Sequence, residues 1–591
     1  MNYDTVLKGG QVLDVETGTL RVADIAFANG LVAALADAPS ELTGTAEIDV
    51  SGRILVPGFI DAHLHIESSM LVPAEFAKSA AAHGTTAAFV DPHEIANVAG
   101  ADGVSYFLDQ AERLPLDLYV GIPSCVPATP LENAGGRIGL SDIDRFLDHP
   151  RVYGLAEMMN FPGIVHGMGD ARAEVTMAHE AGKIVDGHAP GLLGDELNTY
   201  ITNGERDGIV RIMSDHECTW LDEAVEKRRA GMTIALRYGT ASKDLDRILP
   251  ELWDRMDGDL SGFMLCSDDI SAAELLRDGH MDRTVRRTRD LLQASAGLDP
   301  TTATIEALRL ATRNPGAYFA RFFRTQNLPP MGTLAEGARA NAVVLDSLET
   351  LAVRHVFCGG ARVDERNAEP TPPPVPTVLR SSVQLPHPPT ANDFRIEIEP
   401  TPGQETATLR VIEFEPGSLL TGQSVAEFAI GDGGIAADPT RDLAKIAVLE
   451  RHGGPGTRAV GFVRGLGLKT GALASTVAHD SHNLVVAGVE DEALVAACDA
   501  LRQCGGGFAV AVDDDVQVLP LEVGGLMADR SIATVVREFD ELLAAAQSTG
   551  TALENPFMAL SFLSLPVIPE LKITDRGLVD VGRFDFVPLQ A

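Results

Sequence analysis

His63 and His65 follow an apolar segment, residues 54–60 (ILVPGFI), and Glu67 comes two residues later. Alternate side chains of a β-strand face the same side, so these three are expected to point in one direction. Imidazole nitrogens and carboxylate oxygens are common ligands of divalent metal ions. The pattern therefore favours a metal site, and the alternative is a pair of core histidines satisfied by hydrogen bonds.

Seven further apolar runs in the first half of the chain alternate with stretches able to form helices, such as residues 73–84 and 101–114. Eight strand–helix units in this length predict a (β/α)8 barrel. The expected strands lie at residues 54–65, 85–94, 116–126, 152–160, 183–191, 208–217, 232–240 and 262–269.

Most of these expected strands end in acidic or basic side chains. The carboxyl ends of barrel strands meet in one mouth, where active sites of this fold are built. The chain has only 15 histidines, so their repeated placement at strand ends strengthens the metal interpretation of His63 and His65. The strand-end residues are Asp91, His93, Glu94, Glu157, His188, Asp215, His216, Glu217, Arg237, Asp268 and Asp269.

Short strand-like segments separated by turns flank the barrel region on both sides. We expect residues 1–55 and 331–368 to form one small β-sandwich domain, split by the barrel at residues 56–330. A proline-rich linker follows at 369–391, and residues 392–591 predict a C-terminal domain of mixed strands and helices. The predicted class is therefore α/β, a metal-dependent barrel with two accessory domains.

The composition limits the classes of function. A formal net charge of −37 argues against nucleic acid as a partner. No apolar run reaches membrane-spanning length, and the first residues lack a secretory signal, so we expect a cytoplasmic protein without membrane contact. The six cysteines are scattered and predict no disulfide framework. A Gly-x-Ser-x-Gly elbow is missing, which disfavours a serine hydrolase. The chain is compatible with a homodimer or a higher homo-oligomer.

The strand-end motifs resemble those of the amidohydrolase superfamily. The matching segments are DAHLH at 61–65, DGHAPG at 186–191, SDHE at 214–217 and CSDD at 266–269, together with the split β domain. Further segments are similar to the bacterial adenine deaminase family over nearly the whole chain. These are HLHIESSML at 63–71, FVDPHEIANV at 89–98, AEMMNFPGIV at 156–165 and VAHDSHNLVVAG at 477–488.

The resemblance implies hydrolysis of adenine to hypoxanthine and ammonia, a purine salvage reaction, at a site with two divalent metal ions. Manganese or iron is the metal that the family implies, and zinc also suits these ligands. Two alternatives stay open. One is another binuclear amidohydrolase that acts on a different amino-purine or on a cyclic amide. The other is a non-catalytic binding protein on a relic barrel, although none of the expected ligand positions is lost.

The resemblance also implies roles for the metal ligands. His63 and His65 would bind one metal, His188 and His216 the other, and Glu157 would bridge them where some superfamily members use a carboxylated lysine. Asp268 would contact the first metal and carry a proton from a metal-bridged hydroxide to the leaving amine. For Glu157 the alternative is that it binds no metal and only forms a hydrogen bond with a group outside the ligand set. The choice between Asp268 and Asp269 stays open from the residues alone, and the superfamily position favours Asp268.

Nitrogen N1 of adenine must gain a proton while water adds to C6. Mononuclear purine deaminases use a glutamate three residues after the histidine of the fifth strand, but this chain has Gly191 there. Glu94 is the leading candidate for the acid, with Asp91 and His93 beside it as substrate contacts. The alternative is that this segment is a turn whose acids cap the next helix.

The remaining candidates are expected near the substrate. Glu67 and Ser68, with Ser69 beside them, would contact the purine or support the metal ligands, or the serines would cap a helix. Arg237 would hold a polar edge of the substrate or pair with a nearby acid, and Asp269 would orient the substrate or satisfy loop amides. The segment AHDSHN at 478–483 would form a lid over the barrel mouth, a second metal site or a surface loop.

Overall fold

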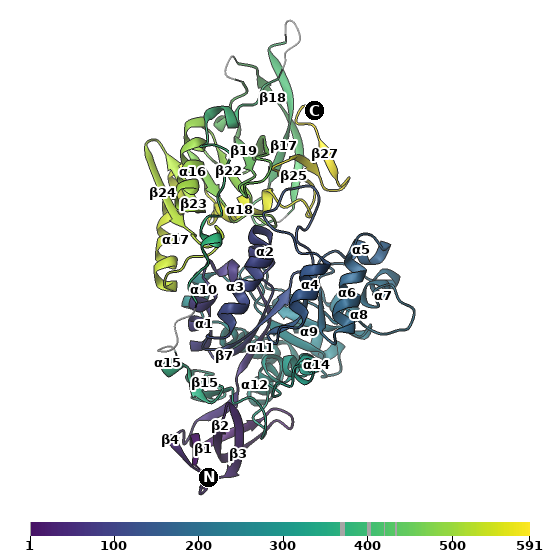
Figure 1. The fold of residues 1–591 in the computed structure, drawn as a ribbon, viewed down its shortest axis with the longest axis vertical. Helices are drawn as coiled ribbons and strands as arrows, with labels where there is room; N and C mark the ends of the chain where they lie inside the picture. The colour runs from purple at the N-terminus through teal and green to yellow at the C-terminus, as the bar shows by residue number, and fades with distance from the viewer. Residues whose placement is uncertain (1, 367–372, 399–403, 419, 432–433) are drawn as a thin grey trace.

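The computed structural model describes residues 2–366, 373–398, 404–418, 420–431 and 434–591. These form a small β domain near the N-terminus, a central barrel and a C-terminal domain, which follow one another along the long axis of the molecule (Figure 1). Within the described ranges, no helix is both long enough and apolar enough to cross a membrane.

Eight parallel strands form the barrel and confirm the predicted fold class. They pair in the orders β10-β9-β8-β7-β6 and β11-β12-β13. The ring closes where Asp268 N donates to His63 O at 3.0 Å and where Met213 N donates to Val185 O at 2.8 Å. The strands are β6 (Phe59–Leu64), β7 (Thr85–Val90), β8 (Asp117–Ile122), β9 (Val152–Met158), β10 (Ile184–Gly187), β11 (Ser214–Asp215), β12 (Thr233–Arg237) and β13 (Phe263–Cys266).

Two of the expected strands differ from the observed ones. The strand expected at 54–65 is two, β5 (Ile54–Pro57) and β6, because the chain passes from one sheet to the next at Gly58. Gly58 N donates to Asn341 O, and a Cβ there would lie 2.1 Å from Thr86 Oγ1. The strand expected at 208–217 keeps only two residues, since Arg211 and Ile212 donate their N–H groups to Ile201 O instead.

Aromatic side chains fill the barrel interior beneath the polar strand ends. Phe89 on β7 stacks on Phe319, with ring centroids 3.3 Å apart, and Tyr119 and Tyr153 pack against the same group. The barrel is therefore a packed core that supports one polar mouth. Helices of this region are α1 (Pro73–Ala82), α2 (His93–Ala99), α3 (Ala101–Ala111), α4 (Leu140–Leu147), α5 (Phe161–His166), α6 (Ala171–Glu180), α7 (Gly194–Ile201), α8 (Leu221–Arg229), α9 (Leu245–Arg255), α10 (Ala272–Arg277), α11 (Met281–Ala296), α12 (Pro300–Ala311), α13 (Arg313–Tyr318) and α14 (Ala320–Thr325).

The small β domain joins strands from both sides of the barrel, with β5 antiparallel to β14. Its strands form one eight-stranded sheet rather than the two sheets of the expected sandwich. The reason is the long β1, which pairs with β4 along its first half and with β5 beyond the bulge between Leu7 and Gly10. The other elements are β1 (Asn2–Asp14), β2 (Thr19–Ala28), β3 (Leu31–Asp37), β4 (Thr43–Asp49), β14 (Ala342–Leu345), β15 (Val353–Cys358), β16 (Ala361–Arg362) and α15 (Val363–Arg366).

The C-terminal domain sits on the mouth of the barrel (Figure 1). It is built on a sheet of order β18-β17-β20-β19-β22-β21-β23-β24 and a three-stranded sheet β25-β26-β27. Ala528 N donates to Met70 O at 2.8 Å and joins the domain to the loop after β6. Its elements are β17 (Thr406–Phe414), β18 (Thr421–Ala429), β19 (Leu443–Leu449), β20 (Arg458–Arg464), β21 (Ala472–Ser475), β22 (Leu484–Gly488), α16 (Asp491–Cys504), β23 (Gly507–Val512), β24 (Asp515–Pro520), α17 (Ile532–Ala546), α18 (Pro556–Leu563), β25 (Leu571–Thr574), β26 (Gly577–Asp580) and β27 (Asp585–Val587).

The expected linker at 369–391 is described only from residue 373 onward, and residues 369–372 lie outside the described ranges. The described part packs on the C-terminal domain: Leu379 is buried and its carbonyl accepts from Gly524 N at 2.7 Å. These residues therefore form part of the junction between barrel and C-terminal domain.

Candidate metal centre and the cavity above it

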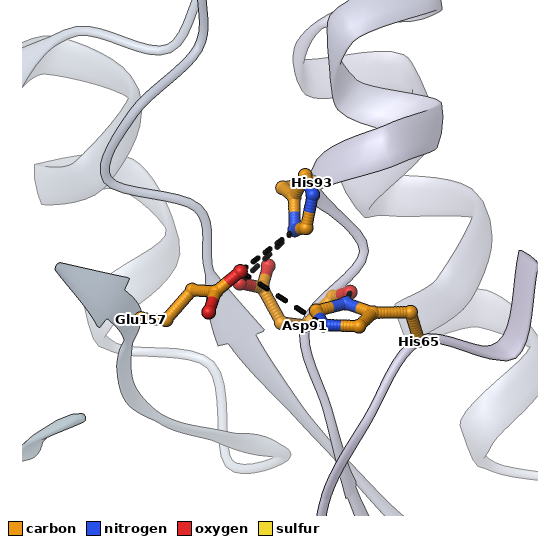
Figure 2. Close-up of side chains that lie close together, drawn as sticks. All are labelled: His65, Asp91, His93 and Glu157. Atoms are coloured by element: carbon orange, nitrogen blue, oxygen red, sulfur yellow. Dashed lines mark hydrogen bonds and ion pairs between the residues drawn. The ribbon is translucent and has the colours of Figure 1, made fainter. Parts of the chain in front are cut away.

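Glu157, at the end of β9, is surrounded by imidazoles from five histidines. The nearest nitrogens are His188 Nδ1 at 2.7 Å and His216 Nε2 at 2.9 Å, both measured to Oε2. On the other side, His93 Nδ1 lies 3.4 Å and His65 Nε2 3.8 Å from Oε1, as Figure 2 shows. His63 Nε2 completes the set at 4.0 Å from Oε2. The two carboxylate oxygens thus face different groups of histidines, which is the arrangement that a bridging ligand needs.

The neighbouring histidines keep the carboxyl group of Glu157 ionised. Burial alone would raise the pKa of this carboxyl, but the adjacent His188 and His216 bring it well below its usual value. In return Glu157, together with Glu217, raises the pKa of His188 to about 9 against the effect of burial. An anionic Glu157 is therefore fixed among imidazoles.

His63 and His65 turn their Nε2 atoms toward each other at 3.2 Å. His65 Nδ1 lies 3.0 Å from the carbonyl oxygen of Asp91, which can only accept, so Nδ1 carries a proton and Nε2 is the nitrogen that faces the centre. The same Nε2 lies 3.2 Å from Asp268 Oδ1. Burial would lower the pKa of His65, but the hydrogen bond with Asp268 and the charge of Glu157 raise it well above its usual value. Burial and the nearby His216 and His65 lower the pKa of His63 well below its usual value, which favours the neutral form that binds metals.

These residues fit divalent metal ions by the chemistry of their donor set. Three groups around the centre each place ligand atoms within 4.8 Å of one another: His65, Asp91, His93 and Glu157; His63, His216 and Asp268; and Glu157, His188 and His216. His65 has its far nitrogen fixed by a backbone carbonyl, as is typical of metal-binding histidines.

Asp268 and Asp269 follow β13 and face different surroundings. Asp268 has φ +55°, and its carboxylate lies between His65 and Arg237, with Oδ2 3.0 Å from Arg237 Nη1. Burial would raise the pKa of Asp268, but the hydrogen bond with His65 and the charge of Arg237 hold it well below its usual range. Asp269 accepts a hydrogen bond from Ser68 and lines the cavity described below. Asp268 thus lies among the histidines, and Asp269 has a ligand atom within 4.8 Å of those of His65 and Asp268 while also lining the cavity.

Arg237, at the end of β12, is buried among carboxylates. It binds Asp244 at 2.8 Å and Asp268 at 3.0 Å, and it also pairs with Glu217. Arg237 does not line the cavity. Of the two expectations for this residue, the structure favours the ion pair over a contact with a polar edge of the substrate.

The three polar residues after β7 divide between the two parts of the site. Asp91 and His93 lie in the histidine cluster, with His93 Nδ1 3.3 Å from Asp91 Oδ2, rather than in the cavity lining expected of substrate contacts. Burial would lower the pKa of His93, but Asp91 raises it to about 10. Glu94 reaches the cavity instead. No side chain caps α2, so the alternative in which the acids of this segment act as helix caps is wrong.

The expectation that Glu67 points the same way as His63 and His65 is wrong. Strand β6 ends at Leu64, and residues Ile66–Ser69 form a 3-10 turn, so the alternation of strand faces stops before Glu67. Glu67 Oε1 accepts from Ile95 N at 3.1 Å. Burial, together with the nearby charge of Glu94, raises the pKa of Glu67 to about 8. The helix caps expected of Ser68 and Ser69 are also absent at α1, which has no side-chain cap.

A cavity of about 330 Å³ lies between the barrel mouth and the C-terminal domain. Its polar side is lined by Glu67, Ser68, Glu94, Asp269 and His479. The apolar lining comes largely from β23, α17 and α18, with Phe508, Phe539, Phe557 and Phe562 among its residues. The apolar wall from the C-terminal domain suits a flat heteroaromatic ring, and the acids of the barrel suit its polar edge.

Sequence reasoning missed Lys227 altogether. This lysine of α8 is fully buried and binds Asp215 at 2.6 Å, Glu223 at 2.7 Å and the carbonyl of Ala189 at 2.6 Å. It thereby ties the chain after His188 to the residue before His216. The charged segment LDEAVEKRR resembles an exposed helix face, and only the four-residue spacing of Glu223 and Lys227 hinted at a pair.

Comparisons with known proteins match both halves of the chain. A family model described as "Amidohydrolase family" matches residues 54–363, and one described as "Adenine deaminase C-terminal domain" matches residues 418–585. An adenine deaminase of Desulfatibacillum aliphaticivorans is 42% identical over 591 residues, which cover 99% of this chain and 97% of the relative. An adenine deaminase of Methanothrix thermoacetophila is 40% identical over 592 residues, which cover 100% of this chain and 97% of the relative.

Proposed function

This chain belongs to the adenine deaminase family of amidohydrolases, and we propose that it hydrolyses adenine to hypoxanthine and ammonia at a binuclear metal centre built around Glu157. The observation that carries the proposal is the position of Glu157. Its two oxygens face separate histidine groups, and a cavity suited to a flat ring is lined by Glu94 and Asp269, which directly follow His93 and Asp268 in the chain.

The resemblance suggests a distribution of ligands, and the distances depart from it at His63, whose Nε2 lies 4.0 Å from the same Glu157 oxygen as the nitrogens of His188 and His216. His63, His65 and Asp268 would hold one ion, His188 and His216 the other, and Glu157 would contact both. Asp91 and His93 lie beside Glu157 and His65, so we assign them to the support of the centre rather than to the substrate. We propose Mn²⁺ or Fe²⁺, and Zn²⁺ suits the same ligands. When bound, such ions lower the pKa of water so that a nucleophile is present at neutral pH.

Asp268 is the residue that we propose moves the proton of the attacking water. Its Oδ1 faces the histidines, while Arg237 holds Oδ2 and keeps the carboxylate anionic and ready to accept. As the water oxygen bonds to C6, Asp268 accepts a proton, and it delivers this proton to the C6 amino nitrogen when the carbon–nitrogen bond breaks. Ammonia then leaves, the second proton of the water passes from the C6 hydroxyl to the carboxylate that has protonated N1, and the oxygen stays on C6 as the carbonyl of hypoxanthine.

Glu94 is the residue that we propose serves N1 of the purine. It lies at the cavity wall, on the first turn of α2. Addition of water at C6 turns N1 into a strong base, and a carboxylic acid within hydrogen-bond reach supplies the proton that this nitrogen keeps in the product. Ser68, Asp269 and Glu67 line the same polar side and are proposed to contact the rest of the purine edge.

The test combines metal analysis with an activity assay. Protein stripped with a chelator should lose adenine turnover, and restoring Mn²⁺ should return it as the metal content approaches two ions per chain. Hypoxanthine and ammonia should form in equal amounts. A panel of other amino-purines and cyclic amides serves as the control. Failure of the fully metallated protein to deaminate adenine would overturn the assignment, and full activity with a single ion per chain would overturn the bridging role of Glu157.

A further inference from the structure

A loop of the C-terminal domain, residues 478–483, reaches the barrel mouth and contacts Glu94. Figure 1 shows α2, which carries Glu94, at the end of the barrel that faces this domain. His482 Nε2 lies 3.9 Å from Glu94 Oε2, and His479 Nδ1 lies 3.6 Å from Glu94 Oε1. Next to them, Asn483 Nδ2 donates to Asn133 O at 2.8 Å, which ties the loop to the barrel. The loop is therefore part of the site's wall.

The protonation of His482 follows from its hydrogen bonds. The backbone N–H of Ala478 donates to His482 Nδ1 at 3.1 Å, so this nitrogen is an acceptor and carries no proton. Burial, together with the nearby His479 and Arg451, lowers the pKa of His482 well below its usual value, which keeps the ring neutral. The single ring proton then resides on Nε2.

Nε2 of His482 is fully buried, and no hydrogen-bond partner is found for it among the described residues at ordinary hydrogen-bond distance. A buried N–H without a partner destabilises the folded chain, so an acceptor that faces this donor is favourable. Glu94 Oε2 is the acceptor that the ring faces. Because Nε2 carries the proton, His482 presents a donor toward Glu94 rather than a lone pair toward a metal ion, although Glu94, His479 and His482 together resemble a cation site.

The other oxygen of Glu94 faces the barrel. Ser68 Oγ lies 3.3 Å from Glu94 Oε1, on the side where the carboxyl meets the cavity, and its single proton points to the nearer Asp269. A glutamate side chain has several rotamers, and a proton transfer to a ring nitrogen requires one of them. Contacts on both oxygens select that rotamer before the substrate arrives. Hydrogen bonds of this kind are often long without substrate and shorten in the complex.

We propose that His482 is a positioning residue of the active site, which fixes the carboxyl of Glu94 by donating from Nε2 across the junction between the two domains. The proposal rests on the proposed function, since it assigns His482 through the role of Glu94. According to this proposal, the C-terminal domain contributes a residue to the active site of the barrel.

Two substitutions test the roles of the two ring nitrogens of His482 separately. His482→Asn keeps an oxygen near the position of Nδ1 for the Ala478 N–H but removes the distal donor. His482→Gln places an amide N–H near the position of Nε2. We expect the first variant to lower kcat for adenine by about 10–100-fold with little change in KM. The second should restore most of kcat. Unchanged kcat in His482→Asn, or equal losses in both variants, would overturn the proposal.

A double-mutant cycle tests whether the effect passes through Glu94. In a Glu94→Gln background, His482→Asn should cost little further kcat, and a full additional loss would contradict the proposal. His452→Asn is the matched control, because His452 Nε2 bonds Ser481 O in the same loop but makes no contact with Glu94. It reports the cost of loosening the loop alone. If it lowers kcat as much as His482→Asn does, the positioning role is wrong.

Crystal structures of the wild type and of His482→Asn distinguish this proposal from the proposed function. Without the donor, the Glu94 carboxyl should leave the rotamer that faces residue 482, whichever purine the enzyme accepts. An unmoved carboxyl would overturn the positioning role even if adenine is the substrate. A moved carboxyl in an enzyme inactive on adenine would support His482 and reject the assigned substrate.

Discussion

Replacement of Lys227 by methionine should destabilise the barrel strongly. Lys227 has a fully buried ammonium group that lies 2.6 Å from Asp215 and 2.7 Å from Glu223, both also fully buried. Burial would lower the pKa of Lys227, but the charge of Asp215 raises it, so the amine is charged in the folded state. Methionine preserves the apolar stem and removes the charge, which leaves two carboxylates without their cation.

Removal of one partner from a buried ion pair costs about 3–5 kcal/mol, since the remaining charge stays desolvated. For a domain of 150–250 residues each kcal/mol lowers Tm by about 2–4 °C, so the expected decrease is roughly 6–20 °C. Lys78→Met is the matched control. Lys78 also lies 2.6 Å from a carboxylate, that of Glu75, but its side chain is 45% exposed. Exposed pairs contribute about 0–1 kcal/mol, so this control should hardly change Tm.

Calorimetry measures the Tm of both variants. Because a chain of several domains need not unfold in one step, hydrogen exchange of the barrel strands identifies which transition belongs to the barrel. Adding Glu223→Gln to Lys227→Met should recover part of the loss, as one unpaired charge disappears. The affinity for the second metal should also fall, because Lys227 ties the segments that carry His188 and His216. A decrease in Tm as small as that of Lys78→Met would refute the reasoning.

Two further predictions concern the proposed metal centre, and one concerns the buried Glu174 of α6. Glu157→Gln should reduce the metal content, measured by plasma mass spectrometry, from two ions per chain to one or fewer; two tightly held ions would contradict the bridging role. Asp268→Asn should lower kcat by about 10²–10⁴-fold while purine binding, measured by calorimetry, persists. Burial and Asp170 raise the pKa of Glu174 from 4.5 to about 7, so the folded state holds this proton more tightly and the free energy of unfolding falls as pH rises between these values. Glu174→Gln should therefore raise Tm at about pH 8 but not below pH 4.5, and an equal shift at both would show that the charge is not the cause.

The barrel and the convergence of the candidate metal-binding residues could be predicted because each depends on local pattern. An apolar run followed by a histidine or an acid specifies a strand and its carboxyl end, and the fold brings all such ends together. His63, His188 and His216 therefore converge as expected. The prediction fails at Glu67 for a local reason as well: the alternation of faces holds only while the strand lasts, and β6 ends at Leu64.

Contacts between distant segments could not be predicted in this way. His482 and Glu94 are nearly 400 residues apart, and nothing near either of them specifies the other. The sequence marks 478–483 as unusual in composition, but only the docking of the C-terminal domain places this loop at the barrel mouth. The same holds for the phenylalanines of the cavity wall, which in sequence resemble ordinary core residues of helices α17 and α18.

The distribution of buried charge supports the proposal that the metal site centres on Glu157. Other buried carboxylates near the strand ends have partners of their own. Asp215 has Lys227, and Asp61 accepts from Ser267 and lies 3.2 Å from His280 Nε2. Asp268 shares Arg237 with Asp244. The ion-pair partners of Glu157, by contrast, are imidazoles, which near neutral pH either gain a proton or offer a lone pair. Metal ions would bind this carboxylate and the imidazole lone pairs together. Glu157 is therefore the position where the buried charges most favour a bound cation.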